Sequence, residues 1–371
     1  MIAFSEVSFN ITASLDFVKT FTNMMIKLSW RNRAFYDKMK EVSSDADAAQ
    51  KAMTSSHTMR TFFPQPLARG EAPGKIILFG EHAVVYGRPA IAAPVQQVRA
   101  RAEIWPADAC VVDAVDLNRR IFVARARRND PLALIVRLVC ERLHRPLPRW
   151  RIRVTSEIPP AAGLGSGAAI STAVVRAMLA GFDEELDNAE VSALVYEVEK
   201  IYHGAPSGID NTVVAYEQPV WFVRGQPPRP FAVARPLHWL IADTGVASPT
   251  RIAVGDVRRA WEQDPARFEM LFDAAGDIAR QARTAIEKGD VAALGLLMDA
   301  NQRLLAEMGV SSPELERLMR AARDAGAVGA KLSGAGRGGN LIALVHEDQV
   351  ERVQQALLRA GAVRVIATIV R

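Results

Sequence analysis

A glycine-rich segment contains the first residues whose types and spacing could do chemistry. Residues 159–168 read PPAAGLGSGA and stand between a strand-like and a helix-like stretch. Glycines let a backbone approach a ligand closely, and a helix that follows adds the positive end of its dipole. The segment therefore predicts a site for an anion, most simply a phosphate. A tight structural turn is the alternative that these residues alone leave open.

A second cluster of glycines, residues 333–339, reads SGAGRGG and separates two strand-like stretches. Four glycines in six residues exceed what a hairpin needs, which indicates that the backbone approaches another group closely. A flexible turn is the alternative. Three charged residues complete the set of candidates. They are Lys75, Glu199 and Asp210, which follows a Pro-Ser-Gly turn. Taken singly, each has the common interpretation of a solvated or turn-forming residue.

Composition limits the class of protein. The chain has 371 residues, room for about two domains. Its 49% hydrophobic and 23% charged residues exclude a wholly disordered chain, and no apolar run reaches the ~18 residues of a membrane span. Two cysteines, Cys110 and Cys140, are expected to be buried and fit a reducing compartment, so we expect a cytoplasmic protein. A net charge of +5 suits anionic ligands, but scattered arginines do not indicate a nucleic-acid binder.

The first 58 residues differ from the rest in their basic residues. They hold five lysines and two arginines, whereas residues 59–371 hold four lysines and thirty-five arginines. Six acidic residues and the lack of a basic cluster before an apolar core argue against a presequence or a secretory signal. We interpret residues 1–58 as a leader with little structure and expect the native start near Met59.

Periodicity predicts the elements around the first glycine segment. Residues 75–79 and 151–155 have the patterns of a buried and a half-buried strand. Residues 168–180 are apolar on nearly every side, as in a deeply buried helix. Another helix begins after Asp187, where Glu190 completes a capping box, and ends at Gly204.

The second half follows a proline-rich connection at 225–236. A strand is predicted at 237–242, and helices at 256–286, 290–308 and 313–325. Strands at 330–333 and 341–345, a helix at 347–360 and a strand at 363–370 complete the chain. A strand–strand–helix–strand series behind a helix is typical of half a ferredoxin-like sandwich, so an α+β class is expected.

Three segments in order resemble the signatures of the GHMP small-molecule kinases. They are 72–87, 160–169 and 331–339, and the resemblance covers the chain from about residue 70 to its end. Two details, GEHAVVYG at 80–87 and HGAPSGID at 203–210, resemble the mevalonate kinases within that superfamily. The resemblance implies two domains, 68–228 like domain 2 of ribosomal protein S5 and nucleotide-binding, and 237–371 ferredoxin-like.

The resemblance also implies roles. Asp210 would be the general base for the acceptor hydroxyl, Lys75 its catalytic partner, and Glu199 a ligand of Mg²⁺. Lys75, Glu81, His82 and Thr250 would contact the acceptor, and His203 would support the turn before Asp210. ATP would lie on Pro160, Ala161, Ala162, Gly163, Leu164, Gly165, Ser166, Gly167, Ala168 and Ala169.

One position departs from the family pattern. Where the family loop has a second serine that provides a metal-ligand hydroxyl, this chain has Gly167. Ser166 or water would then complete the Mg²⁺ shell, and catalysis is expected to survive because Mg²⁺ keeps several waters.

The implied activity is ATP-dependent phosphorylation of the primary hydroxyl of mevalonate, which leads to isoprenoids. The partners would be ATP and mevalonate, with no nucleic acid and no membrane, and a homodimer is allowed. Two alternatives stay open: another kinase of the superfamily, acting on phosphomevalonate, homoserine or a sugar, or a non-catalytic ligand-binding regulator. A related decarboxylase is disfavoured, because the segment 203–210 is intact.

Overall fold

A computed structural model describes residues 65–159, 163–204, 206–248 and 250–371. The predicted leader, 1–58, and the expected start near Met59 lie outside the described residues. Residues Pro66–Arg371 form one compact unit. Within the described residues, no helix combines the length and the apolarity that crossing a membrane requires.

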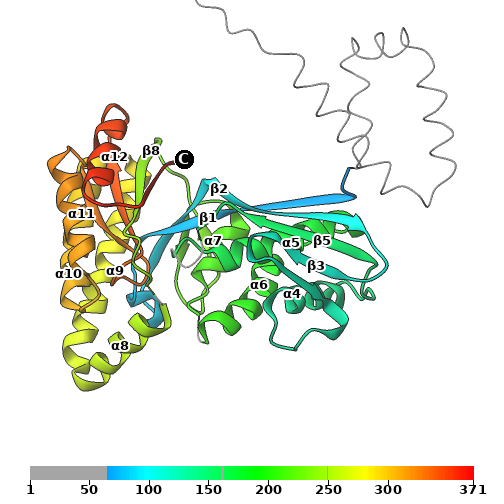
Figure 1. Cartoon of the computed structure of the whole chain (residues 1–371). Helices are drawn as coiled ribbons and strands as arrows, with labels where there is room; N and C mark the ends of the chain where they lie inside the picture. Colours follow the sequence, from blue (N-terminus) through cyan, green and yellow to red (C-terminus); the bar gives the residue numbers. More distant parts are fainter. Residues whose placement is uncertain (1–64, 160–162, 205, 249) are drawn as a thin grey trace, which may run out of the picture. The chain divides into compact units, whose positions relative to one another are not determined.

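The first part of this unit is built on a seven-stranded sheet with the order β4-β3-β5-β2-β6-β7, in which β1 also pairs with β2 (Figure 1). The strands are β1 (Ala68–Phe79), β2 (Ala90–Pro106), β3 (Val111–Ala114), β4 (Arg119–Phe122), β5 (Trp150–Ser156), β6 (Val220–Phe222) and β7 (Arg229–Pro230). β1 and β2 are antiparallel, and their register shifts between Pro73 and Gly74. The shift lies one residue before Lys75, at the place where the strand reaches the first glycine segment.

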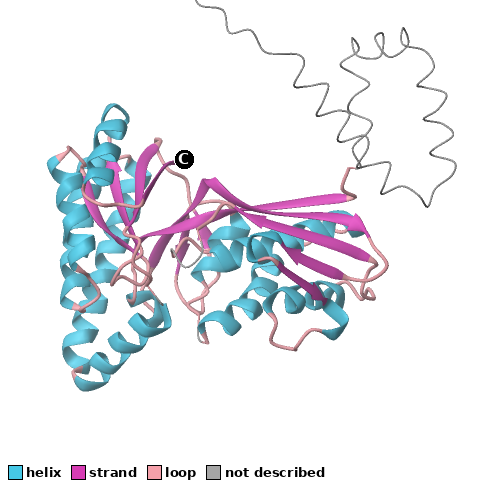
Figure 2. Ribbon diagram, viewed as in Figure 1, coloured by secondary structure: helices cyan, strands magenta, loops and turns pink. Residues whose placement is uncertain are grey.

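Four helices belong to this part and lie on one side of the sheet (Figures 1 and 2). They are α4 (Pro131–Arg142), α5 (Ser166–Phe182), α6 (Asn188–His203) and α7 (Ile209–Tyr216). α5 packs against β1 and β2, and ten of its residues are buried, which confirms the buried helix predicted there. α6 has the predicted capping box of Asp187 and Glu190, and Gly204 ends it.

The second part is a four-stranded antiparallel sheet with the order β11-β8-β10-β9, the order of a ferredoxin-like sandwich. Its strands are β8 (Leu237–Asp243), β9 (Gly329–Ser333), β10 (Asn340–Val345) and β11 (Arg364–Val370). Its helices are α8 (Thr250–Gln263), α9 (Pro265–Lys288), α10 (Val291–Glu307), α11 (Pro313–Asp324) and α12 (Val350–Arg359). The α+β class is therefore confirmed.

Three predicted elements need correction. The single helix expected at 256–286 is two helices, α8 and α9, because Asp264 caps a new N-terminus and Pro265 occupies the first helical position. The connection at 225–236 contains the short edge strand β7. One turn of 3-10 helix, η5 (Glu347–Gln349), precedes α12 within the helix predicted at 347–360.

Candidate active site

Lys75 and Asp210 form an ion pair between β1 and α7. Lys75 Nζ lies 3.0 Å from Asp210 Oδ1, and the side chains are 4% and 27% exposed respectively. The pair therefore reaches solvent through the aspartate. A nearby ammonium favours the ionised forms of a carboxylate and of a hydroxyl that is losing its proton. The arrangement can receive an alcohol beside a positioned carboxylate, which phosphoryl transfer to a hydroxyl requires.

The first glycine segment holds Lys75 from both its main chain and its side chain. The Lys75 N–H donates to Leu164 O at 2.9 Å. The lysine side chain passes directly over Gly165, where an added Cβ would lie 2.8 Å from Lys75 Cγ. Gly165 also has a φ of +72°, which favours glycine. A larger residue at this position would displace the lysine from Asp210.

Asp210 lies in the first turn of α7, which begins directly after Gly208 at φ +92°. The following residues fix that turn. Asn211 Nδ2 donates to Ser192 O at 3.1 Å and to Ser192 Oγ at 2.9 Å, and Thr212 Oγ1 donates to Gly208 O at 2.7 Å. Because these bonds are buried, they hold the first turn of α7 against α6 with little competition from water.

The start of α5 has the properties of an anion site. Gly163 and Gly165 have left-handed φ angles, and no side chain caps the helix at Gly165. The N–H groups of the first turn have no acceptor within the helix and point out of its positive end. Ser166 and Gly167 are half-buried there, whereas Ala168 and Ala169 are buried. The predicted ATP contacts Pro160, Ala161 and Ala162 lie outside the described residues.

Glu199 and Gly167 meet beside this loop. Glu199 is 3% exposed, and its Oε1 is a buried oxygen without a hydrogen-bond partner. A Cβ at Gly167 would lie 3.1 Å from that oxygen. The orphaned carboxylate oxygen fits a hard cation such as Mg²⁺. The described residues contain no cluster of three or more His, Cys, Asp or Glu side chains arranged for a metal, so water and phosphate oxygens would have to supply most ligands.

His203, predicted to support the turn before Asp210, contacts Glu199 at the end of α6. Its Nε2 lies 3.3 Å from Glu199 Oε2, one helical turn away on α6. The hydrogen bond with Glu199 raises the pKa of His203 against the opposing effect of burial. The histidine therefore occupies one oxygen of Glu199, and the other oxygen stays open toward the loop.

Glu81 and His82 are buried and contact the second part of the unit. Glu81 pairs with Lys331 of β9, and both side chains are fully buried. Burial raises the pKa of Glu81 and lowers the pKa of Lys331, while their mutual attraction opposes both shifts. His82 Nε2 is 3.0 Å from Ala335 O, and burial lowers the pKa of His82 to about 4. Lys75 also acts electrostatically on Glu81 and lowers its pKa.

Thr250 is also a predicted acceptor-binding residue, but none of the contacts in the described residues joins it to Lys75, Glu81 or His82. It is exposed at the start of α8. The structure thus brings Lys75, Asp210, Glu199, Gly165 and Gly167 together at the first glycine segment, whereas Glu81 contacts Lys331. His82 contacts the second glycine segment instead.

A cavity of about 550 Å³ lies between β4 and the start of α4. Its lining includes Arg119, Arg120, Phe122, Arg125, Arg127 and Asp130. Arg119 and Asp130 also act electrostatically on the hydroxyl of Tyr202, whose ring edge would lie 3.2 Å from a Cβ at Gly167. Phe122 is 49% exposed. An exposed aromatic ring among arginines suits a ligand with both a flat ring and phosphate groups: the ring could stack on Phe122 and the phosphates could pair with the arginines.

Two residues near the site had no role in the sequence-based prediction. Lys331 could have been found, because it is, like Lys75, one of only four lysines in residues 59–371. Tyr202 gave no such signal, since its contact with Gly167 depends on how α6 packs against α5.

Known proteins match this chain over most of its length. The model for the GHMP kinases N terminal domain matches residues 132–218, and that for GHMP kinases C terminal matches 282–363. The mevalonate kinase of Aeropyrum pernix is 37% identical over 314 residues, which cover 81% of this chain and 96% of that protein. The mevalonate kinase of Pyrococcus abyssi is 34% identical over 324 residues, 82% and 96% of the two chains.

A solved structure agrees. The crystal structure of L. major mevalonate kinase in complex with R-mevalonate matches with a TM-score of 0.71 and 31% identity, covering 83% of this chain and 99% of that chain. The chain belongs to the GHMP kinase family. Within that family, the relatives just described all carry the name mevalonate kinase. The predicted two-domain GHMP kinase fold is confirmed.

Proposed function

We propose that the chain transfers the γ-phosphoryl group of ATP to the primary hydroxyl of (R)-mevalonate, giving 5-phosphomevalonate for isoprenoid synthesis. The observation that carries the proposal is the Lys75–Asp210 ion pair beside the start of α5. The similarity to mevalonate kinases over 96% of a relative's length supports the choice of acceptor.

Asp210 is assigned the role of the general base that accepts the proton of the acceptor hydroxyl. The hydroxyl oxygen attacks the γ-phosphorus, the bond from that phosphorus to the ADP oxygen breaks, and the proton passes to the Asp210 carboxylate. Lys75 stabilises the developing alkoxide and holds the carboxylate in place. The unpaired N–H groups at the start of α5 stabilise the negative charge that spreads over the phosphates.

Mg²⁺ would be held through the open oxygen of Glu199, with Ser166 as the neighbouring hydroxyl. When bound, the ion neutralises phosphate charge. The rest of ATP is assigned to the cavity between β4 and α4, where Phe122 offers a ring face and the arginines offer positive charge. Glu81, His82 and Thr250 stay predicted acceptor contacts, and a cytoplasmic location and a homodimer stay predictions.

A substrate panel tests the proposal. ADP release should be measured with mevalonate, phosphomevalonate, homoserine and galactose side by side. We expect mevalonate to give a kcat/KM at least about 100-fold above the other three, because contacts to the wrong acceptor are lost at the reacting centre. A higher value for another acceptor would reassign the substrate. ADP release with none of them, combined with tight binding of mevalonate, would favour the non-catalytic regulator.

A further inference from the structure

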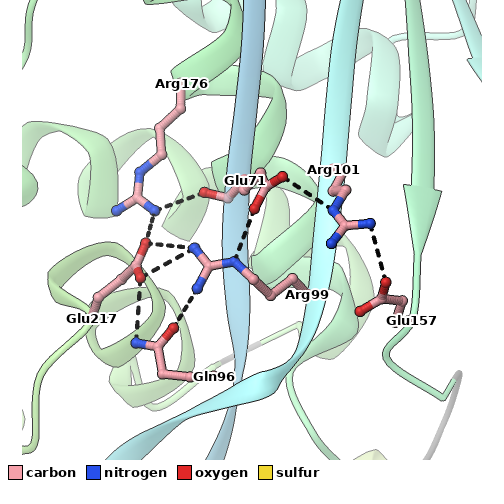
Figure 3. Close-up of polar contacts among 7 residues, drawn as sticks. All are labelled: Glu71, Gln96, Arg99, Arg101, Glu157, Arg176 and Glu217. Carbon is pink, nitrogen blue, oxygen red and sulfur yellow. Dashed lines mark hydrogen bonds and ion pairs between the residues drawn. The ribbon is translucent and has the colours of Figure 1, made fainter. Parts of the chain in front are cut away.

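A charged network lies at the opposite ends of the elements that carry the active site. Figure 3 shows its members, three arginines, three glutamates and one glutamine. They are Glu71, Gln96, Arg99, Arg101, Glu157, Arg176 and Glu217. Arg176 and Glu217 are 25% and 27% exposed, so solvent screens their attraction less than it screens an exposed pair.

Arg176 joins three elements with one guanidinium. It is a residue of α5 and donates to the main-chain oxygen of Glu71 on β1 at 2.8 Å. It also donates to the carboxylate of Glu217, directly after α7 (Figure 3). A further bond goes to the main-chain oxygen of Ala215 on α7 at 2.8 Å. Ala215 O is in the last turn of α7, where main-chain oxygens lack partners within the helix.

Each of the three elements runs from this guanidinium to the active site. α7 carries Asp210 in its first turn, roughly 10 Å along the helix from Glu217. β1 carries Lys75, roughly 13 Å along the strand from Glu71. α5 begins at Ser166, roughly 15 Å from Arg176.

β1 and α5 approach each other closely without Arg176, whereas α7 is held at two places: at its start by Asn211, which donates to Ser192 of α6, and at its end by the contacts of Arg176. At Gly70 the two backbones touch, because a Cβ there would lie 2.3 Å from Ala173 O and from Ala177 N. The end of α7 is held in part through Glu217, which has a φ of +52°. Besides Arg176, Arg99 donates to Glu217 at 3.2 Å and Gln96 donates at 3.4 Å.

We propose that Arg176 is a positioning residue for phosphoryl transfer. It holds the end of α7 against α5 and β1 and thereby fixes the distance between the Asp210 carboxylate and the Lys75 ammonium. This inference rests on the proposed function for its kinetic consequences. Its structural claim, the 3.0 Å separation, does not depend on which acceptor the enzyme uses.

Arg176→Met keeps much of the side-chain length and removes all donors. We expect kcat to fall roughly 10- to 100-fold, because a displacement of about 1 Å at the reacting groups has such an effect. The KM for ATP should stay within about threefold, since the start of α5 is not moved. Arg176→Lys should recover part of the loss.

Arg101→Met is the matched control, because Arg101 contacts only the side chains of Glu71 and Glu157 in Figure 3. The kcat of this variant should stay within about twofold of the wild type.

An Asp210→Asn background separates positioning from general damage. There Arg176→Met should lower the residual kcat by less than about threefold, because the carboxylate that it positions is gone. An equal loss in both backgrounds, or no loss in either, would overturn the proposal. If Arg176→Met does not fold, Glu217→Gln replaces it, with the same pattern expected at smaller size.

The crystal structure of the same variant gives the activity-independent result. We expect a Lys75 Nζ–Asp210 Oδ1 separation beyond hydrogen-bonding distance, and an unchanged separation would contradict the proposal. An inactive wild-type protein with a widened pair in the variant would refute the proposed function and leave the positioning role standing.

Discussion

The two glycine-rich segments look alike in sequence, but their glycines have different neighbours. In the first, Gly163 faces open space, Gly165 lies against Lys75, and Gly167 lies against Glu199 and Tyr202. In the second, Gly336 and Gly338 lie against backbone, where an added Cβ would be 2.0 Å from Val310 O and 2.7 Å from Val246 O respectively. The first segment thus leaves backbone and charged groups accessible to a ligand. The second lets loops of the same half pack and places Ala335 O on His82.

The largest effect on stability is expected at Lys331, on the strand that leads into the second segment. Lys331→Met would leave the buried Glu81 without its partner, which should lower the free energy of unfolding by about 3–5 kcal/mol. Because burial raises the pKa of Glu81 in the folded state, the loss should grow as the pH rises above the usual value near 4.5.

Urea unfolding of the Lys331→Met variant at pH 5 and pH 8 measures both effects. A variant as stable as the wild type at pH 8 would show that the pair does not hold the two parts together. The double variant Glu81→Gln/Lys331→Met is the control, and most of the lost stability should return with it.

The next largest effect on the free energy of unfolding is expected at Gly336. Comparing it with Gly334 separates steric packing from backbone conformation in the second segment. Gly336→Ala combines a φ of +76° with a backbone contact of 2.0 Å, so we expect a loss of about 3 kcal/mol. Gly334→Ala is the matched control, with a φ of +94° but no atom within 4 Å, and should cost about 1 kcal/mol. Equal values in urea unfolding would mean that backbone packing is not the reason for these glycines.

The pH dependence of stability tests the contact between His82 and the second segment. Its pKa is lowered to about 4 in the folded state, against 6.5 without burial, so the unfolded state binds the proton first. Stability should therefore fall as the pH drops from 6.5 toward 4, by about 2 kcal/mol at pH 5. His82→Gln should flatten this part of the stability profile. A wild-type profile that matches the variant's would contradict the buried, neutral histidine.

Gly167→Ser tests the first segment, where the effect on stability should be smallest. The new Cβ would be tight against Glu199 Oε1 at 3.1 Å and Tyr202 Cε2 at 3.2 Å, and the half-exposed Tyr202 ring can move. The added hydroxyl should lower the Mg²⁺ concentration for half-maximal activity by roughly 10-fold. The Gly167→Ser/Tyr202→Ala variant controls for crowding. No change in the Mg²⁺ requirement of either variant would show that the family serine is dispensable here.

The sequence patterns predicted most elements around the site but few of its contacts. The strand that contains Lys75, the buried helix α5 and the capped helix α6 follow from periodicity and caps within a few residues of chain. The break between α8 and α9 could also have been predicted, because Pro265 follows the potential cap Asp264. The contacts of Lys331 with Glu81 and of Arg176 with Glu217 join distant segments, and only tertiary packing brings these residues together.

The meeting of Lys75 and Asp210 could be expected only from the family resemblance, because no local pattern relates β1 to α7. The role of the pair is the central claim, and ³¹P NMR of product formation from ATP and (R)-mevalonate tests it most directly. For Asp210→Asn we predict a rate at least about 10³-fold below the wild type, with the Kd of mevalonate by calorimetry within about fivefold. A rate within about tenfold of the wild type would contradict the assignment of Asp210 as the group that receives the proton.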